Sequence, residues 1–255
     1  MTKNWLVPFN GRNESSHSKL NFLYKLNNIY FMDNHRAASW CWEQHTQPNS
    51  KINLIHIDAH SDATEISMRD FKMLPDPKRC SIIEYLETEE ITHCENRLKV
   101  VRWDNYISAF LHSHRKNIDY IMTCSHGSSS IKGLFNDTSK IIIANNKVES
   151  YILPALNSLH MYSSQKDTPK KSIINIDLDF FSGKCNTNHQ PEKYLKDIAE
   201  KTGKLITCEN ICITICLSPE CCGGWAEAER LLKIFNHYAG INFELPDNKL
   251  QCFHQ

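Results

Sequence analysis

Two runs of strand-forming residues in this chain each end in a short acidic segment. Residues 52–57 lead into Asp58-Ala59-His60-Ser61-Asp62, and residues 172–176 lead into Asp177-Leu178-Asp179. Side chains two residues apart in a strand point the same way, so each segment can present its acidic groups on one side. If the segments converge, like charges raise one another's pKa, and the carboxylates need a counter-charge to stay ionised. Two divalent cations are the simplest counter-charge, so the pattern predicts a two-metal hydrolytic site.

The composition argues against several classes of partner. Lys+Arg and Asp+Glu both number 29, and no long basic block is present, so nothing favours nucleic acid. The start, residues 1–5, lacks the charged-then-apolar pattern of a secretory signal. No apolar run reaches the length of a membrane span, about 18 residues. We therefore expect a cytoplasmic protein with no nucleic-acid or membrane partner, and the sequence leaves its oligomeric state open.

The eleven cysteines are expected to be reduced thiols, as is usual in a cytoplasmic protein. Five of them gather near the end of the chain and could be imagined as a zinc site: Cys208, Cys212, Cys216, Cys221 and Cys222. Their spacing contains no paired CxxC elements, and free cysteine is often simply buried. The sequence therefore favours buried thiols over a zinc cluster.

Apolar, β-branched runs alternate with helical patterns along the chain. We expect strands over residues 28–32, 52–57, 98–101, 118–124, 141–144, 173–176 and 211–217. We expect helices over residues 36–43, 81–87, 105–112, 191–202 and 225–238, with Asp104 as the N-cap of the third. This alternation is typical of a mainly parallel sheet covered by helices on both faces. Residues 1–255 are expected to form a single domain.

Seven candidate site residues share one position, because each lies just after an apolar, strand-like run. They are His35, Asp58, Asp62, His126, Asp177, Asp179 and Glu220. In open α/β sheets, ligands bind beyond the carboxyl ends of the strands. The shared position therefore predicts one site along that edge of the sheet.

The two acidic segments together resemble motifs of the ureohydrolase superfamily, whose members include arginase and agmatinase. Asp33-Asn34-His35 stands where the family usually has Gly-Gly-Asp-His, here without the glycines. The resemblance consists of separate motifs scattered over much of the chain. It is closest to the atypical peptide arginases, which convert arginine side chains of precursor peptides to ornithine. It implies an α/β protein with a three-layer α/β/α arginase-like fold and a mainly parallel central sheet.

The resemblance also implies a set of six metal ligands: His35, Asp58, His60, Asp62, Asp177 and Asp179. Asp58 and Asp177 would bridge two ions. His35 and Asp62 would complete one ligand set, and His60 and Asp179 the other. Each ion would then have one imidazole and otherwise oxygen ligands, a hard set that suits Mn²⁺. The implied cofactor is two Mn²⁺ per chain, which would lower the pKa of a shared water from about 15.7 toward neutrality.

The same resemblance implies catalytic roles for three residues. Asp62 would orient the attacking water, and Glu220 resembles the glutamate that binds the substrate guanidinium. His126 resembles the histidine proposed as proton shuttle, although the family's histidine follows the first acidic motif more closely. The leaving amine needs a proton, which a group titrating near neutrality can supply.

Each of these residues also has an ordinary structural interpretation. The aspartates can be helix caps, and Asp33 or Asn34 can cap the helix that begins near His35. His126 can be a structural histidine beside a Gly-Ser turn. Glu220 can be a glutamate in the first turn of a helix.

One departure from the family concerns the substrate. In arginases of free arginine, an asparagine two places past the first acidic motif helps to hold the α-carboxylate, and this chain has Thr64 there. A residue within a peptide has no free α-carboxylate, so Thr64 is compatible with an arginine-containing precursor peptide as partner, as in natural-product biosynthesis. The expected products are peptidyl ornithine and urea.

Other functions remain open at this point. The substrate could be free arginine, agmatine or another small guanidino compound. A deacetylase-like amide hydrolase would typically use one catalytic zinc, and a non-enzymatic binding protein could occupy a decayed hydrolase scaffold. Trp103 and Asp104 could line the pocket, and residues 65–96 receive no assigned role.

Overall fold

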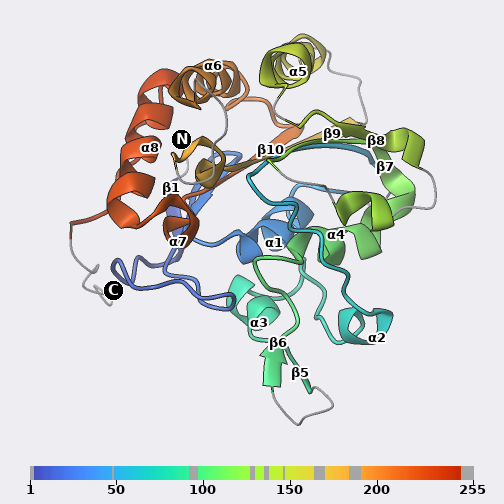
Figure 1. Ribbon diagram of the computed structural model, residues 1–255. Coiled ribbons are helices and arrows are strands. Elements are labelled where there is room, and N and C mark those ends of the chain that lie inside the picture. Colours follow the sequence, from blue (N-terminus) through green and yellow to red (C-terminus); the bar gives the residue numbers. More distant parts are fainter. Residues whose placement is uncertain are drawn as a thin grey trace.

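A central eight-stranded sheet organises the chain (Figure 1). The computed structural model describes residues 3–47, 49–91, 97–126, 130–134, 138–145, 147–163, 170–183 and 191–247. In sheet order the strands are β1 (Lys3–Val7), β2 (Leu23–Leu26), β3 (Ile29–Met32), β10 (Ile211–Cys216), β9 (Lys170–Asp177), β4 (Lys51–Ile57), β7 (Ile118–Cys124) and β8 (Ile141–Ile143). Neighbours from β3 to β8 are parallel, whereas β1 and β2 add to the edge as antiparallel strands. The expected mainly parallel sheet is confirmed.

Helices cover both faces of this sheet, giving three layers (Figure 1). One face carries α5 (Leu153–Ser163), α6 (Pro191–Gly203) and α8 (Trp225–Ala239). The other face carries α1 (Ala38–Glu43), α2 (Met68–Phe71), α3 (Ile82–Leu86) and α4 (Tyr106–His114). Each face has its own apolar core, and the α/β/α fold expected from the sequence is confirmed.

Shorter elements connect these layers. The 3-10 turns are η1 (His35–Ala37), η2 (Arg115–Asn117), η3 (Ser130–Leu134), η4 (Thr138–Lys140) and η6 (Leu178–Phe181), and η5 (Val148–Ile152) is a π-helical turn. A four-residue helix, α7 (Pro219–Cys222), follows β10. A separate two-stranded sheet pairs β5 (Glu89–Ile91) with β6 (Arg97–Lys99). Among the described helices, none is long and apolar enough to cross a membrane.

The central strands are buried on both faces, which explains their near-continuous apolar sequences. Every residue of β10 is buried, as is every residue of β4 after Lys51. The strand register places Ile57 beside Ile176, and Cys216 beside both Asp177 and Met32. The carboxyl ends of β3, β10, β9 and β4 therefore lie next to one another at one edge of the sheet.

The structure departs from the sequence expectations at several elements. The strand expected over residues 98–101 is shorter and pairs only with β5, outside the central sheet. Helix α4 begins at Tyr106, so Asn105 rather than Asp104 holds the N-cap position. The Asp104 carboxylate instead faces Arg102, with Oδ1 3.5 Å from Nε. Strands β1 and β2 and helix α5 were not expected.

Candidate metal centre

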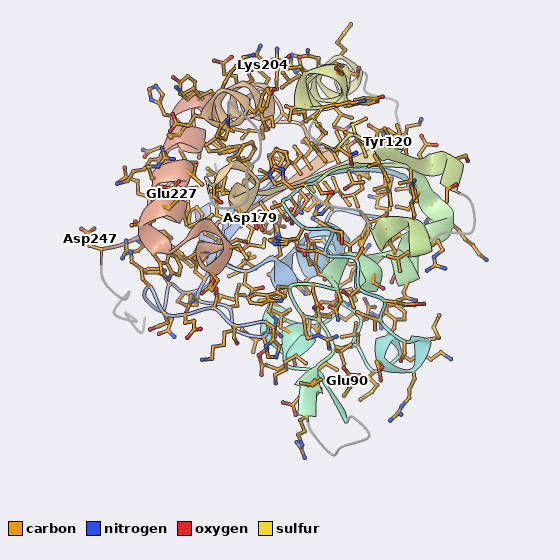
Figure 2. All side chains as sticks on the ribbon, viewed as in Figure 1. Glu90, Tyr120, Asp179, Lys204, Glu227 and Asp247 are labelled. Atoms are coloured by element: carbon orange, nitrogen blue, oxygen red, sulfur yellow. The ribbon has the colours of Figure 1, made fainter. Side chains whose placement is uncertain are left out.

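The two acidic segments converge at the carboxyl edge of the sheet. Asp58 to Asp62 follow β4, and Asp177 and Asp179 lie at the end of the neighbouring strand β9. In Figure 2, Asp179 is labelled near the middle of the molecule, and its side chain is fully buried. A cavity of about 520 Å³ opens at this edge. The described residues that line it include four of the six expected ligands: His35, His60, Asp62 and Asp177. The other two, Asp58 and Asp179, are buried and group with them within 4.8 Å.

Asp58 and Asp177 each divide their two oxygens between a local turn and the site. Asp58 Oδ1 accepts a hydrogen bond from the His60 amide at 2.7 Å, and Asp177 Oδ1 accepts one from the Asp179 amide at 3.0 Å. Their Oδ2 atoms lie 3.3 Å and 3.1 Å from His35 Nδ1. The capping interpretation of these aspartates is therefore correct for one oxygen, while the other faces the neighbouring functional groups.

His35 is presented by a turn that two other residues stabilise. Asn34 caps η1 by accepting a hydrogen bond from the Arg36 amide at 3.0 Å, and its side-chain amide donates to the Ser16 carbonyl. Asp33 binds the backbone amides of Asn21 and Phe22. Burial raises the pKa of Asp33 to about 7 despite these hydrogen bonds. Asn34 thus supplies the cap and Asp33 holds the N-terminal loop, while the imidazole of His35 faces the carboxylates.

The second half of the site is built by His60 and Asp179. His60 Nδ1 lies 3.0 Å from Asp179 Oδ2 and 3.6 Å from Asp58 Oδ1. Asp179 Oδ1 accepts a hydrogen bond from the Ala59 amide at 3.2 Å, which ties the end of β9 to the end of β4. Half of the His60 side chain is exposed toward the cavity, whereas Asp179 is completely enclosed.

Two residues at the site adopt left-handed backbone conformations. Asp62 has a φ of 45° and Ser218 a φ of 42°. Non-glycine residues in this region cost of order 1–3 kcal/mol, and such conformations cluster at functional sites. Ser218 gains a compensating interaction, because its hydroxyl donates to Asp177 Oδ2 at 2.6 Å. The turn at Asp62 brings its Oδ2 within 3.4 Å of His35 Nδ1.

The electrostatics of this cluster are unbalanced without an added positive charge. Burial, with the charges of Asp177 and Asp58, raises the pKa of Asp179 to about 8. Burial and the Asp58 charge also raise the pKa of Asp62 well above its ordinary value. Burial opposes ionisation of Asp58, but its interactions with His35 and His60 hold its pKa below the ordinary value. Carboxyl groups of this cluster must therefore retain protons unless cations replace them.

The donor set fits divalent cations. Both ring nitrogens of His35, Oδ2 of Asp58 and Oδ2 of Asp179 are buried and lack a hydrogen bond within the described structure. Four groups of three donor atoms lie within 4.8 Å of one another: His35–Asp58–Asp62, Asp58–Asp177–Asp179, His35–Asp177–Cys216 and His60–Asp179–Cys221. Buried donor atoms that gather this closely are suited to metal coordination.

Glu220 lies across the cavity in the first turn of α7. Its Oε1 accepts a hydrogen bond from the Ser15 amide, and its Oε2 accepts one from the Ser15 hydroxyl, both at 2.5 Å. The first-turn interpretation is therefore correct, and the carboxylate also faces the cavity. Trp103, Asp104 and Thr64 line the same cavity, as the sequence suggested for the first two.

His126 occupies a different place from the one expected of a proton shuttle. Its ring stacks on Phe180 with centroids 4.4 Å apart, and its Nε2 lies 3.0 Å from the Phe180 carbonyl. It is not among the described residues that line the cavity, although the adjacent Ser125 is. These contacts favour the structural interpretation of His126.

A buried polar network supports the site from below. Asn175, two residues before Asp177, lies 3.0 Å from His56 Nδ1 and donates to the Tyr106 hydroxyl at 3.0 Å. Its carbonyl accepts from the Thr214 hydroxyl at 2.6 Å. His56 Nε2 in turn lies 3.9 Å from Asp58 Oδ2. Sequence reasoning missed this network, although the position of Asn175 in an otherwise apolar strand was an available signal.

Ser15 and Ser218 were missed as well. Ser218 could have been noticed because it directly precedes Pro219-Glu220 after a buried strand. Ser15 gave no signal, since it lies 205 residues from its partner. None of the candidate metal-binding groups in the described ranges contains two cysteines, so the imagined five-cysteine zinc site does not form there.

Comparison with known proteins gave matches only at the level of structure. No protein-family profile and no curated protein sequence matches the chain. An arginase of Entamoeba histolytica, solved in complex with L-ornithine, aligns with a TM-score of 0.45 and 14% identity, over 84% of this chain and 69% of that one. An arginase of Bacillus cereus aligns with a TM-score of 0.43 and 11% identity, over 86% and 72% respectively. Both of these matched structures are arginases.

Proposed function

We propose that this chain is a two-metal hydrolase that cleaves the guanidino group of an arginine residue in a peptide, producing ornithine and urea. The observation that carries the proposal is the convergence of the four aspartates and two histidines of the site below a cavity lined by Glu220. Two cations held there, Mn²⁺ in the first instance, would lower the pKa of a water between them toward neutrality.

Glu220 is suited to bind the substrate guanidinium, which stays protonated at all physiological pH values. Each carboxylate oxygen can accept two hydrogen bonds, so the bonds from Ser15 leave capacity for a ligand. Ser15 also fixes the plane of the carboxylate, which a planar, bidentate partner requires. Binding at Glu220 would direct the guanidino carbon toward the acidic segments across the cavity.

Asp62 is suited to move the proton. In the reaction the water oxygen bonds to the guanidino carbon, and the bond from that carbon to the side-chain nitrogen breaks. The proton released by the water passes to Asp62 and then to the departing nitrogen. Asp62 lines the cavity, with Oδ2 3.4 Å from His35 Nδ1, so its carboxylate is placed to take the proton from the attacking water and to return it to the leaving nitrogen.

The lining of the cavity favours a substrate without a free α-carboxylate. The described residues that line it include no lysine or arginine, whereas Asp104, Asp62 and Glu220 are all acidic. A free α-carboxylate would meet like charges there, but a residue within a peptide would not. Agmatine is the second candidate, because it also lacks a carboxylate and its amine could pair with Asp104.

The test compares three substrates on protein loaded with Mn²⁺ and, in parallel, with Zn²⁺: an arginine-containing peptide, agmatine and free arginine. Conversion of the peptide should appear as a loss of about 42 Da per arginine by mass spectrometry, because the guanidino carbon leaves as urea. Asp62→Asn should abolish the reaction, while Asp76→Asn, at an exposed aspartate, should leave it unchanged. Urea from agmatine alone would select the second candidate, and no urea from any substrate would refute both.

A further inference from the structure

We propose that Cys216 and Cys221 are metal ligands, one thiol for each of the two ions, so that the centre prefers thiophilic divalent ions such as Zn²⁺ over Mn²⁺. This inference rests on the proposed two-ion site and specifies its ligands. It departs from the sequence argument for Mn²⁺, which counted only carboxylates and imidazoles.

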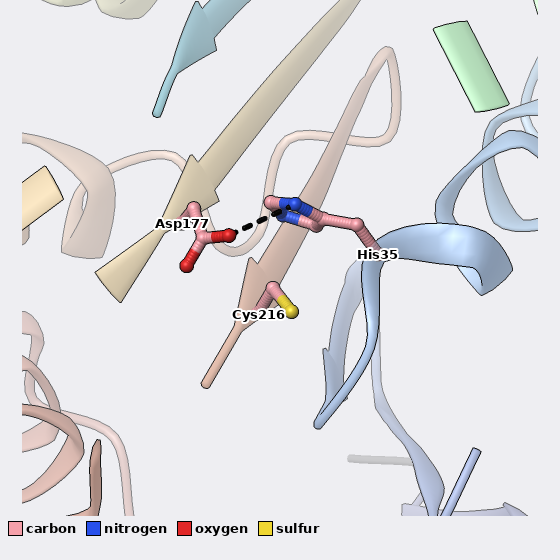
Figure 3. Close-up of side chains that lie close together, drawn as sticks. All are labelled: His35, Asp177 and Cys216. Atoms are coloured by element: carbon pink, nitrogen blue, oxygen red, sulfur yellow. Dashed lines mark ion pairs between the residues drawn. The ribbon is translucent and has the colours of Figure 1, made fainter. Parts of the chain in front are cut away.

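The first thiol belongs to a group shown in Figure 3, where Cys216 lies beside Asp177 and His35. The donor atoms of these three residues all lie within 4.8 Å of one another. Cys216 is the last residue of β10 and pairs in register with Asp177, the last residue of β9. Paired residues on neighbouring strands place their side chains on the same face of the sheet. The strand register therefore places the thiol beside the carboxylate.

Burial strengthens this assignment. Cys216 is completely enclosed and His35 is 2% exposed. Both ring nitrogens of His35 lack a hydrogen bond within the described structure, although Asp177 Oδ2 is only 3.1 Å from Nδ1. The imidazole, the thiol and the carboxylate are thus enclosed together, and one cation would satisfy all three groups.

The second thiol completes a group of the same composition. Donor atoms of Cys221, His60 and Asp179 again lie within 4.8 Å of one another, and Cys221 lines the cavity. The left-handed turn at Ser218 starts α7, and the Cys221 amide donates to the Ser218 carbonyl at 3.0 Å. This turn carries Cys221 back over the acidic segments. Each ion position thus has one imidazole, one carboxylate and one thiol.

Two neighbouring cysteines lie outside these donor groups, although Cys216, like them, has a hydrogen-bond partner, its Sγ lying 3.1 Å from the Ser218 hydroxyl. The thiol of Cys222 donates to the Leu217 carbonyl at 3.2 Å, and that of Cys212 faces the Cys41 carbonyl. Neither belongs to a candidate metal-binding group in the described ranges. Thiolate donors together with imidazole favour Zn²⁺ and related ions, whereas oxygen-only sites suit Mn²⁺. A coordinated thiol loses its proton, so each ion would bind as a metal thiolate.

Titration of metal-free protein with Co²⁺ tests the inference by spectroscopy rather than by activity. Wild type should develop a near-ultraviolet thiolate-to-metal charge-transfer band that saturates with bound metal. Cys216→Ser and Cys221→Ser should each remove about half of the band, and the double variant all of it. Cys212→Ser, four residues before Cys216 in the same buried strand, is the matched control and should keep the full band.

A competition experiment provides the second measurement. Wild type dialysed against equal concentrations of Zn²⁺ and Mn²⁺ should retain Zn²⁺ with at least about tenfold preference. The double variant should lose most of this preference. Zinc should also slow alkylation of Cys221 in wild type, measured by peptide mapping, which needs no folded variant. Two bound ions without a thiolate band or Cys221 protection would overturn this inference and leave the proposed function intact. Failure to bind any divalent ion would overturn both.

Discussion

Ser15 donates hydrogen bonds from its amide and its hydroxyl to the two carboxylate oxygens of Glu220, across 205 residues of sequence. The loop that carries Ser15 is held in turn by Asp33, whose carboxylate binds the amides of Asn21 and Phe22. The proposed guanidinium-binding group is therefore oriented by the N-terminal loop, and that loop is anchored beside the candidate metal centre.

Removing the Ser15 hydroxyl should weaken substrate binding. A hydrogen bond to a charged group contributes about 1.5–3 kcal/mol, so Ser15→Ala should raise the KM for the guanidino substrate about tenfold or more. The change in kcat should be smaller, because Glu220 does not touch the reacting water. Steady-state kinetics would measure the split, with Glu227→Gln on the exposed side of α8 as control. An unchanged KM would argue against a binding role for Glu220.

Asp179 should be required for the second ion. Asp179→Asn keeps the shape of the side chain but removes the charge that faces His60. Bound metal, measured by elemental analysis after gel filtration, should fall from two ions toward one per chain. Asp119→Asn, which breaks a surface pair with Lys170, should retain both ions. Two ions in Asp179→Asn would remove this aspartate from the ligand set.

Stability of the metal-free protein should fall as pH rises from about 5 to 9. Burial, with the charges of Asp177 and Asp58, raises the pKa of Asp179 to about 8, so the folded chain keeps a proton that the unfolded chain releases near 3.8. Pairing with Asp179 and then Asp58 raises the pKa of His60 to about 11, so this proton is also held more tightly when folded. Both pKa shifts stabilise the folded state at low pH. Their contribution to the free energy of unfolding is lost as the pH rises.

Metal binding should reverse this trend, because cations displace the retained protons. The increase in melting temperature caused by saturating metal should grow between pH 6 and 9, as measured by calorimetry at each pH. Asp179→Asn should flatten the profile of the metal-free protein. A metal-free profile that rises with pH over this range would contradict the assigned shifts.

Asn175 should be important for stability beneath the site. Its side-chain amide contacts His56 and Tyr106, and its carbonyl accepts from Thr214. Asn175→Ala would leave these buried groups unpaired, at about 1–3 kcal/mol each, so urea denaturation should show a loss of roughly 3 kcal/mol or more. Ser158→Ala, at an exposed helix position, should change stability by less than about 0.5 kcal/mol.

Sequence patterns were sufficient for the parts of the fold that depend on local burial. Strands β4, β7, β9 and β10 were recognised because burial on both faces demands a run of apolar residues. Strands β1 and β2 were missed, since an edge strand such as Lys3–Val7 mixes polar and apolar residues and is stabilised by its partner. The position of the acidic segments at strand ends was predicted for the same reason, because it follows from where the apolar runs stop.

Local sequence patterns did not predict contacts between segments that are far apart in the chain. The thiol of Cys216 is relevant only because β10 pairs with β9 in a register that sets it beside Asp177. The expected N-cap at Asp104 was wrong by one residue, because the chain turns once more before α4 begins. His126 follows a strand as expected, yet its ring stacks on Phe180 and it is not among the described residues that line the cavity.

The order of strands in the sheet also governs when the centre can assemble. The last strand in the described part of the chain, β10, is inserted between β3 and β9, and so separates the strand that leads to His35 from the strand that ends at Asp177. Until this final insertion fixes the spacing, an emerging or truncated chain has the aspartate and histidine ligands but not their common geometry. Acquisition of metal should therefore mark the completion of folding, and fragments that end before Ile211 should bind ions weakly.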